Sequence, residues 1–281
     1  MKISKIKSHA KINLALNING KNKGLHKIES IICFLDLHDG ISINQYRGNK
    51  HKISFSGPFS KNIGTKNTVK NLFQKLDNEN LLKNKKFKIR INKKIPQKAG
   101  LGGGSMNAAS VLNYFIKNKI INLNPKKIRS ICNSIGSDVI LGTILSSCVL
   151  SSSGRIKKIY NIPKYHSILV KPNFGCSTKE IYSAVAKYTK PKFSKPKKHM
   201  FEGKYLINQQ NALEEIAFKK YPKLKKIKLF LENINNPLFI RMTGSGSTIV
   251  AYYKSLKSCK LAKAKIKRKY KNYWCVTAKT I

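Results

Sequence analysis

Four glycines lie within five residues of the segment PQKAGLGGGSMNAASVL, which covers residues 96–112 and continues into an apolar helical pattern. Glycine inside regular structure costs roughly 0.5–1 kcal/mol relative to alanine, so such a cluster needs a reason. Glycine N–H groups ahead of a helix can converge on an anion, and the helix N-terminus adds partial positive charge. The segment therefore predicts a phosphate-binding loop. A tight strand-to-helix connection without a ligand is the alternative.

Two other phosphate-binding patterns fit this segment less well. The pattern G-x-x-x-x-G-K-[ST] requires a lysine, whereas Gly104 is followed by Ser105 and Met106. The dinucleotide pattern G-x-G-x-x-G matches at Gly100 and Gly102 but has Ser105 in place of its third glycine. What remains is a general anion-binding turn, in which Ser105 either caps the helix or donates its hydroxyl.

Acidic residues are scarce, which shortens the list of candidates for catalysis. Between Glu79 and Glu180 the chain has one carboxylate, Asp138. It precedes an apolar run, where a carboxylate is costly to bury without a partner. We interpret Asp138 as a site residue, with a helix cap as the alternative because aspartate favours that position. Lys11 opens an apolar strand, where a lysine is unusual unless it faces a partner, and solvation at a strand edge is the alternative.

The net charge is extreme. The 281 residues include 57 Lys and Arg against 11 Asp and Glu, for a net charge of +46, and six of the basic residues are arginine. Specific recognition of nucleic acid relies on arginine, whereas lysine is spread evenly along this chain. A general enrichment in lysine explains this pattern better than one dedicated surface. We expect nonspecific binding to nucleic acid at low salt and no specific nucleic-acid partner.

The sequence also predicts a cytoplasmic protein with no membrane partner. Its apolar stretches are too short or too interrupted to cross a bilayer, and its basic N-terminus lacks the features of a secretory signal. Six cysteines are scattered without a C-x-x-C pair, which favours reduced thiols over a zinc site or a disulfide framework.

The elements that must position these residues are of both types, so the fold class is α+β. Strands are expected at 11–18, 28–37, 40–46, 51–57, 86–95 and 146–151, and helices at 67–83, 105–117 and 124–136. The pattern changes near 152–165. Beyond it we expect strands at 166–172 and 273–281, helices at 177–188, 211–233 and 255–270, and a strand–turn–strand at 237–253.

Four segments, in order from Lys11 to Ala251, resemble the GHMP small-molecule kinases. PQKAGLGGGSMNAASVL is similar to that family's central phosphate motif, GSDVILG to its aspartate segment, and RMTGSGSTIVAYY to its second glycine turn. The N-terminal segment AKINLALNINGKNKGLHKIESIICFLDLHD resembles one branch, the 4-diphosphocytidyl-2-C-methyl-D-erythritol kinases. Homoserine or mevalonate kinases remain as alternatives, and a basic RNA-binding module is an alternative from another class.

The resemblance implies a two-lobed GHMP kinase fold. Residues 1–155 would form a ribosomal protein S5 domain 2-like lobe and residues 156–281 a ferredoxin-like lobe. It implies transfer of phosphate from ATP, with Mg²⁺, to the 2-hydroxyl of 4-diphosphocytidyl-2-C-methyl-D-erythritol, in the non-mevalonate isoprenoid pathway. No side chain is assigned as a metal ligand, and the expected state is a monomer or a weak homodimer.

The resemblance also implies roles for individual residues. Lys11 and Asp138 would be catalytic, and a Lys11–Asp138 pair would keep the aspartate ionised. Asn13, His26, Thr178 and Tyr182 would bind the substrate, with His26 and Tyr182 at the cytosine. The second glycine turn is Gly244, Ser245 and Gly246. The ATP-binding residues would be Pro96, Gln97, Lys98, Ala99, Gly100, Leu101, Gly102, Gly103, Gly104, Ser105 and Met106.

Three departures from the family pattern stand out. Leu25 replaces the tyrosine that usually precedes the histidine and flanks the cytosine, which puts the tightness of base recognition in question. Lys98 lies where small or apolar residues are usual, and a further phosphate contact is one role open to it. The run after Asp138 reads VIL where the family has V-P, so its shape is expected to differ.

Overall fold

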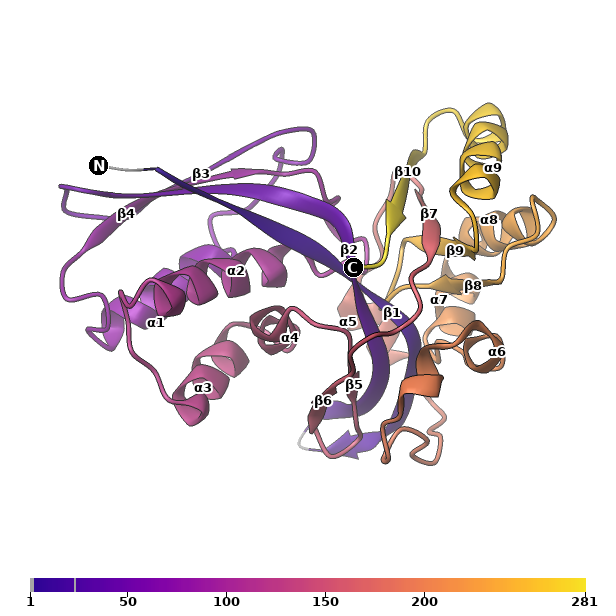
Figure 1. Ribbon diagram of the computed structural model, residues 1–281, viewed down its shortest axis with the longest axis horizontal. Coiled ribbons are helices and arrows are strands. Elements are labelled where there is room, and N and C mark those ends of the chain that lie inside the picture. The colour runs from indigo at the N-terminus through magenta and orange to yellow at the C-terminus, as the bar shows by residue number, and fades with distance from the viewer. Residues whose placement is uncertain (1–2, 23) are drawn as a thin grey trace. The chain divides into compact units, whose positions relative to one another are not determined.

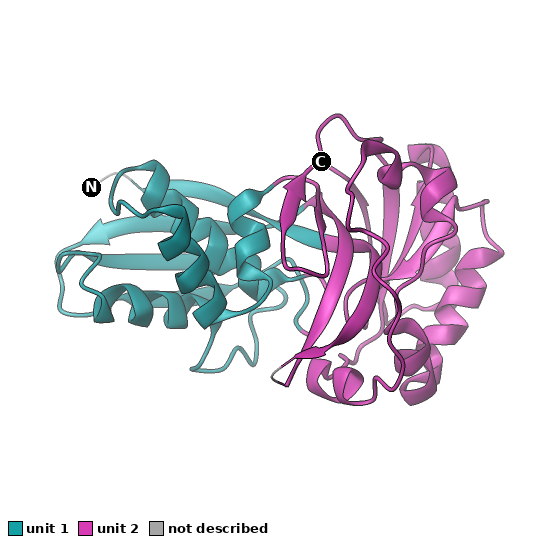
Figure 2. Cartoon of the chain, turned by 90° about the horizontal axis from the view of Figure 1, so that it is seen from below, with its two compact units in different colours: residues 1–11, 37–97, 102–145 teal, residues 12–36, 98–101, 146–281 magenta. Residues whose placement is uncertain are grey.

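The computed structural model describes residues 3–22 and 24–281 and shows mixed helices and sheets (Figure 1). The chain forms two compact units (Figure 2). Unit 1 comprises residues 1–11, 37–97 and 102–145, and unit 2 comprises residues 12–36, 98–101 and 146–281. Two long strands, β1 (Ser4–Asn22) and β2 (Leu25–Tyr46), contribute residues to both units. The expected lobe boundary after residue 155 stays a prediction.

The sheet of unit 1 is built on the second half of β2. This half pairs antiparallel with β4 (Lys86–Asn92), and β4 pairs in parallel with β3 (Lys52–Ser56). The separate strands expected at 28–37 and 40–46 are one continuous strand, because Gly40 stays in register opposite Asn92. The strand expected at 86–95 is confirmed as β4, in which the alternate residues Phe87, Ile89 and Ile91 are all buried.

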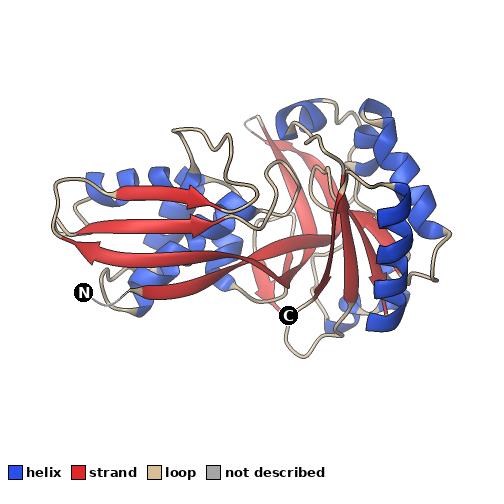
Figure 3. Cartoon of the chain, turned by 90° about the horizontal axis from the view of Figure 1, so that it is seen from above, coloured by secondary structure: helices blue, strands red, loops and turns tan. Residues whose placement is uncertain are grey.

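Helices cover one face of this sheet (Figure 3). Helices α1 (Thr68–Asn78) and α2 (Gly103–Lys117) lie next to the sheet, and α3 (Pro125–Ile135) and α4 (Val139–Ile144) lie on the other side of these two helices (Figure 1). The core of unit 1 consists of apolar side chains from these helices packed on the inner face of β2 and β4. Burial of such side chains contributes roughly 1.5–3 kcal/mol each, so this core stabilises the unit.

Unit 2 contains a four-stranded antiparallel sheet in the order β10-β7-β9-β8. The strands are β7 (His166–Lys171), β8 (Phe239–Met242), β9 (Ile249–Tyr253) and β10 (Trp274–Lys279). Helices α7 (Glu214–Lys220), α8 (Pro222–Glu232) and α9 (Leu256–Lys269) pack on it around one apolar core. The succession strand–helix–strand–strand–helix–strand is the expected ferredoxin-like arrangement.

Shorter elements complete unit 2. The three-residue strand β5 (Cys148–Leu150) pairs antiparallel with the first half of β2, and β6 (Ile156–Lys158) pairs with β5. Helix α5 (Thr178–Ser183) follows β7. A 3₁₀ turn at Lys198–Phe201 and the single turn α6 (Gly203–Leu206) precede α7.

Several expected helix limits are wrong. Helix α1 ends at Asn78 instead of residue 83, because Asn80 and Lys83 adopt positive φ angles of 52° and 45°. Helix α5 stops at Ser183, five residues before the expected end. The helix expected over 211–233 is broken before Pro222, which has no N–H to continue α7 and instead begins α8.

All six cysteines are buried free thiols. Burial raises the pKa of the Cys33 and Cys148 thiols to about 12, which holds both in the uncharged form at neutral pH. In the described part of the chain, no helix combines the length and the apolar character that a membrane crossing requires.

Candidate functional site

Lys11 and Asp138 form an ion pair in unit 1. The Lys11 Nζ atom lies 3.0 Å from Asp138 Oδ2, and the lysine side chain is 5% exposed whereas the aspartate is 31% exposed. Asp138 precedes α4, yet its side chain makes no capping hydrogen bond to that helix. The helix-cap alternative for this carboxylate is therefore not what the structure shows. Its accessible carboxylate instead lies beside a buried ammonium group.

Gly102 brings the glycine loop against Lys11. Its φ angle is +67°, and a Cβ atom at this position would lie 2.8 Å from Lys11 Cγ. Gly102 is also the N-cap residue of α2, so the helix begins at Gly103, two residues earlier than expected. Ser105 lies within the first turn, and the expectation that it caps the helix is wrong. The start of α2 thus lies beside the buried lysine because Gly102 has no side chain.

The next two glycines contact other parts of unit 1. A Cβ atom on Gly103 would lie 3.0 Å from Ile95 Cγ2 and 3.3 Å from Lys93 Nζ. A Cβ atom on Gly104 would lie 3.2 Å from Thr68 Oγ1, which donates a hydrogen bond to the Gly104 carbonyl oxygen at 2.6 Å. These contacts hold the first turn of α2 in a defined position, as a site that binds phosphate by backbone N–H groups requires.

A buried ion pair that was not predicted from the sequence anchors the segment leading into the glycine loop. The Asp39 carboxylate pairs with the Lys93 ammonium group, and its Oδ1 atom accepts the N–H groups of Lys94 at 2.7 Å and Ile95 at 2.9 Å. Both charged side chains are buried. Gln97 extends this anchoring, because its Nε2 donates to two backbone carbonyls of the loop after β3. The available signal was an aspartate in FLDLHD, at the end of an apolar strand.

In unit 2, the first glycine loop meets the second. Gly100 has a φ angle of +73°, and a Cβ atom there would lie 2.0 Å from the Thr243 carbonyl oxygen. The Thr243 hydroxyl donates to the Gly100 carbonyl at 3.2 Å and accepts the Asn13 N–H at 3.0 Å. The Asn211 side chain donates to the Gly244 carbonyl at 2.8 Å. Gly100 therefore provides close backbone packing, a role that the phosphate-loop interpretation had not assigned to it.

Lys98 lies close to the segment that precedes α5. Its φ angle is +48°, and a Cβ atom on Gly175 would lie 2.4 Å from Lys98 Cβ. This contact explains why a glycine stands at position 175. A phosphate contact from the Lys98 side chain stays a prediction.

Two of the predicted substrate residues, Asn13 and Thr178, make hydrogen bonds within unit 2. Asn13 is buried, and its Nδ2 donates to the Ser30 hydroxyl at 2.8 Å. The hydroxyls of Thr178 and Ser245 lie 2.9 Å apart, which connects α5 to the second glycine turn. In this pair one hydroxyl donates and the other accepts. The donating hydroxyl can still accept a hydrogen bond from a ligand, and the accepting hydroxyl can still donate one.

His26 lies among aromatic rings. Its ring centroid is 5.4 Å from that of Tyr182 and 6.3 Å from that of Tyr188, which was not predicted. The roles of His26 and Tyr182 at the cytosine stay predictions. Partial burial and the positive charge of Lys21 lower the pKa of His26, which favours a neutral imidazole. The Leu25 side chain is 77% exposed.

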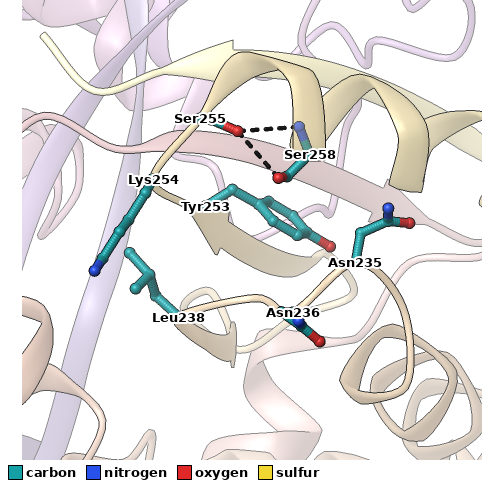
Figure 4. A pocket seen from close by; sticks show the side chains of 7 residues that line it. All are labelled: Asn235, Asn236, Leu238, Tyr253, Lys254, Ser255 and Ser258. Atoms are coloured by element: carbon teal, nitrogen blue, oxygen red, sulfur yellow. Dashed lines mark hydrogen bonds between the residues drawn. The ribbon is translucent and has the colours of Figure 1, made fainter.

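A further pocket in unit 2 has a volume of about 450 Å³ (Figure 4). Its lining consists of Asn235, Asn236, Leu238, Tyr253, Lys254, Ser255 and Ser258. The Ser255 hydroxyl accepts the Ser258 N–H at 3.1 Å and thereby caps α9. This lining includes none of the predicted site residues. Within residues 3–22 and 24–281, no three His, Cys, Asp or Glu side chains gather in a metal-binding cluster.

Comparisons with known proteins establish the fold and the family of this chain. Residues 65–146 match the family model described as GHMP kinases N terminal domain. The chain has the fold of a solved 4-(cytidine 5'-diphospho)-2C-methyl-D-erythritol kinase, with a TM-score of 0.79 at 21% identity over 98% of this chain and 99% of that one. The two-lobed α+β GHMP kinase fold is thus confirmed.

Two curated relatives carry the same name, 4-diphosphocytidyl-2-C-methyl-D-erythritol kinase. The protein from Pelagibacter ubique is 56% identical over 99% of both chains. The protein from Clostridium perfringens is 34% identical, covering 95% of this chain and 94% of its own length. Because identity at this level covers nearly the full length of both relatives, the chain belongs to the 4-diphosphocytidyl-2-C-methyl-D-erythritol kinase family of the GHMP kinases.

Proposed function

We propose that this chain transfers the γ-phosphoryl group of ATP to the 2-hydroxyl of 4-diphosphocytidyl-2-C-methyl-D-erythritol, a step of the non-mevalonate isoprenoid pathway. The observation that carries the proposal is the 56% identity over 99% of the Pelagibacter ubique kinase. A kinase of the homoserine or mevalonate type and a basic RNA-binding module have no comparable support.

Asp138 accepts or orients the proton of the acceptor hydroxyl, and Lys11 holds its carboxylate in place. Their separation of 3.0 Å and the partial exposure of Asp138 support these roles. Phosphoryl transfer passes through a loose transition state in which positioning and charge stabilisation dominate over base strength. A carboxylate fixed by a buried ammonium group suits that requirement.

The segment 96–106 holds the triphosphate of ATP. Backbone N–H groups at the start of α2 and the dipole of this 15-residue helix supply the attraction for phosphate. The buried Asp39–Lys93 pair and Thr68 keep these groups in position. Preorganised donors of this kind lose little free energy to reorganisation when the ligand binds.

Asn13, His26, Thr178 and Tyr182 bind the acceptor substrate. The ring contact of His26 with Tyr182 supports a site for a flat base, and a neutral imidazole can both donate and accept hydrogen bonds at its edge. The paired hydroxyls of Thr178 and Ser245 suit polar groups of the ligand. The second glycine turn, Gly244–Gly246, holds Ser245 in place through the contact of Gly244 with Gly100.

ATP use follows from the kinase family, and we propose Mg²⁺ as the accompanying ion. Mg²⁺ bound to a nucleotide keeps several waters and uses substrate phosphates with one or two carboxylates, so it needs no cage of side chains. The metal would neutralise charge on the phosphates, and no side chain is assigned as its ligand. A cytoplasmic location and a monomer or weak homodimer stay predictions.

The test is ATP-dependent release of ADP in the presence of Mg²⁺, with the cytidyl substrate offered beside homoserine, mevalonate and galactose. The proposal expects turnover on the cytidyl substrate alone and its loss in the Asp138→Asn variant. Turnover of one of the other alcohols would support the kinase activity and contradict the proposed substrate. A folded protein that turns over none of the four compounds would contradict the proposed activity.

A further inference from the structure

An irregular segment after α5 is fastened to β1. We call residues 188–193 the strap. The Thr189 N–H donates to the Ile18 carbonyl at 2.8 Å, and the Asn19 side chain donates to the Thr189 carbonyl at 3.1 Å. The strap has no helix or strand of its own, so these bonds set the position of its first residues.

The buried carboxylate of Glu29 fastens the other end of the strap. Its Oε1 atom accepts the Lys192 N–H at 2.7 Å and the Asn17 side-chain amide at 3.1 Å, and its Oε2 atom accepts the Phe193 N–H at 2.9 Å. Glu29 is fully buried, and so is the Phe193 side chain. A carboxylate is buried at an acceptable cost only when such donors surround it. No motif in the sequence distinguishes Glu29.

The strap presents Tyr188 to His26. The two ring centroids lie 6.3 Å apart with the planes tilted by 50°, while Tyr182 approaches the same histidine from α5 at 5.4 Å and 42°. Tyr188 is nevertheless 48% exposed. Three rings from three separate segments thus gather at one place, with a large part of one ring open to solvent. An aromatic ring held at a fixed site with an open face is suited to bind another flat ring.

We propose that Tyr188 provides an aromatic face for the cytosine base of the substrate, and that Glu29 is a positioning residue that holds Tyr188 there through the strap. This inference rests on the proposed function. Leu25, next to His26 in sequence, is aliphatic and exposed, so the ring that position 25 lacks is supplied from a distant part of the chain. Stacking of this kind gives affinity for a base, while hydrogen bonds at the base edge select which base binds.

The first test compares Tyr188→Leu, which removes the ring, with Tyr188→Phe, which keeps it. Tyr160→Leu is the matched control, because Tyr160 is an exposed tyrosine of the same unit. Tyr188→Leu is expected to raise KM for the cytidyl substrate roughly tenfold, the size of one lost base-stacking contact, with kcat and KM for ATP changed by less than about twofold. Tyr188→Phe and Tyr160→Leu should match the parent enzyme. Unchanged KM in Tyr188→Leu, or an equal loss in Tyr188→Phe, overturns the assignment.

The second test addresses Glu29. Glu29→Gln should raise KM for the cytidyl substrate without changing KM for ATP. If Glu29 acts through the strap, the double variant Glu29→Gln/Tyr188→Leu should show no higher KM than Tyr188→Leu alone, because the ring that Glu29 positions is already absent. Multiplicative effects in the double variant would overturn the positioning role. Thermal melting of each variant confirms that the fold is intact, and the Tyr188 comparison remains decisive if Glu29→Gln does not fold.

Direct binding of cytidine 5′-diphosphate separates this inference from the proposed function. If the parent protein does not turn over the cytidyl substrate yet binds cytidine 5′-diphosphate about tenfold better than Tyr188→Leu does, the proposed function fails and the base site stands. If turnover is intact and Tyr188→Leu binds the nucleotide as well as the parent, the inference alone fails. Absence of binding to the parent overturns the base site.

Discussion

The ammonium group of Lys11 lies 3.0 Å from the carboxylate of Asp138, and the aliphatic part of the same lysine packs where a side chain on Gly102 would have to be. The lysine is thereby fixed from two directions, by charge at its end and by backbone contact along its length. This arrangement connects the start of the phosphate loop to the proposed catalytic carboxylate through one buried side chain.

Asp138→Asn is expected to lower kcat by roughly 10²–10⁴-fold, the usual contribution of a positioned proton acceptor, with KM for ATP little changed. Steady-state release of ADP measures both constants. Lys11→Met should also be slow, and the double variant should be no slower than Asp138→Asn alone, because residues that act as one unit are not additive. A strong rise in KM for ATP in Asp138→Asn would point instead to a role in nucleotide binding.

Gly100→Ala is expected to destabilise the protein far more than Gly154→Ala. The two glycines have nearly equal φ angles of +73° and +76°, so both substitutions carry the same backbone strain of roughly 1–2 kcal/mol. Only at Gly100 would the added methyl group also collide with a carbonyl oxygen, that of Thr243 at 2.0 Å, whereas nothing lies within 4 Å at Gly154. Chemical denaturation measures the difference. Equal losses would contradict the close packing of the two glycine turns.

Asp39→Ala is expected to reduce the free energy of unfolding by about 3–5 kcal/mol, because it leaves the buried Lys93 charge without its partner. Glu202→Ala is the matched control. It removes the partner of Lys204, whose side chain is 85% exposed, and surface pairs of this kind contribute less than about 1 kcal/mol. KM for ATP should rise in Asp39→Ala alone, since Asp39 holds the approach to the glycine loop. A loss of stability no larger than that of Glu202→Ala would show that Asp39 does not anchor it.

The free energy of unfolding should decrease on acidification, because His51 in unit 1 has a lowered pKa in the folded protein. His51 Nδ1 accepts the Phe87 N–H at 3.1 Å, and burial lowers the pKa of His51 from 6.5 although Asp77 lies 3.1 Å from Nε2. The unfolded chain therefore binds more protons than the folded one between the lowered pKa and 6.5. The free energy of unfolding should decrease as the pH falls through 6.5 and level off below the folded pKa.

Denaturation of the parent and of His51→Leu at pH 8 and pH 5.5 isolates this effect from other titrating groups. The difference in stability between the two proteins should shrink at the lower pH. A difference that stays constant, or grows, would mean that His51 is protonated in the folded state.

Regular patterns made much of the fold predictable. Strict alternation of apolar residues identified β4, and the apolar positions of α2 predicted its packed face, because both patterns are local. The continuity of β2 through Gly40 was not predictable in the same way, since a glycine marks a turn unless a partner strand keeps it in register. The break between α7 and α8 does have a local signal, because Pro222 has no N–H group to continue a helix.

In the candidate site, residues within motifs were predictable, and residues placed by contacts distant in sequence were not. The Lys11–Asp138 pair was predicted, because motif order placed both residues. The roles of His26 and Tyr182 at the cytosine stay predictions, and their rings lie 5.4 Å apart. Tyr188 was not predicted, since the strap has no periodic pattern. Its position depends on two hydrogen bonds to the buried Glu29 and on two to β1, both far away in the sequence. Lys93 is hidden among the many other lysines, and only its buried partner Asp39 distinguishes it.

The burial of every cysteine has a practical consequence for following this enzyme as it unfolds. A bulky maleimide can alkylate a thiol only after the surrounding structure has opened, so brief labelling followed by peptide mass spectrometry records opening events. Cys132 belongs to unit 1, and the other five cysteines belong to unit 2. The natural sequence therefore already carries separate chemical reporters for the two units, and the order in which they open can be read without introducing a probe.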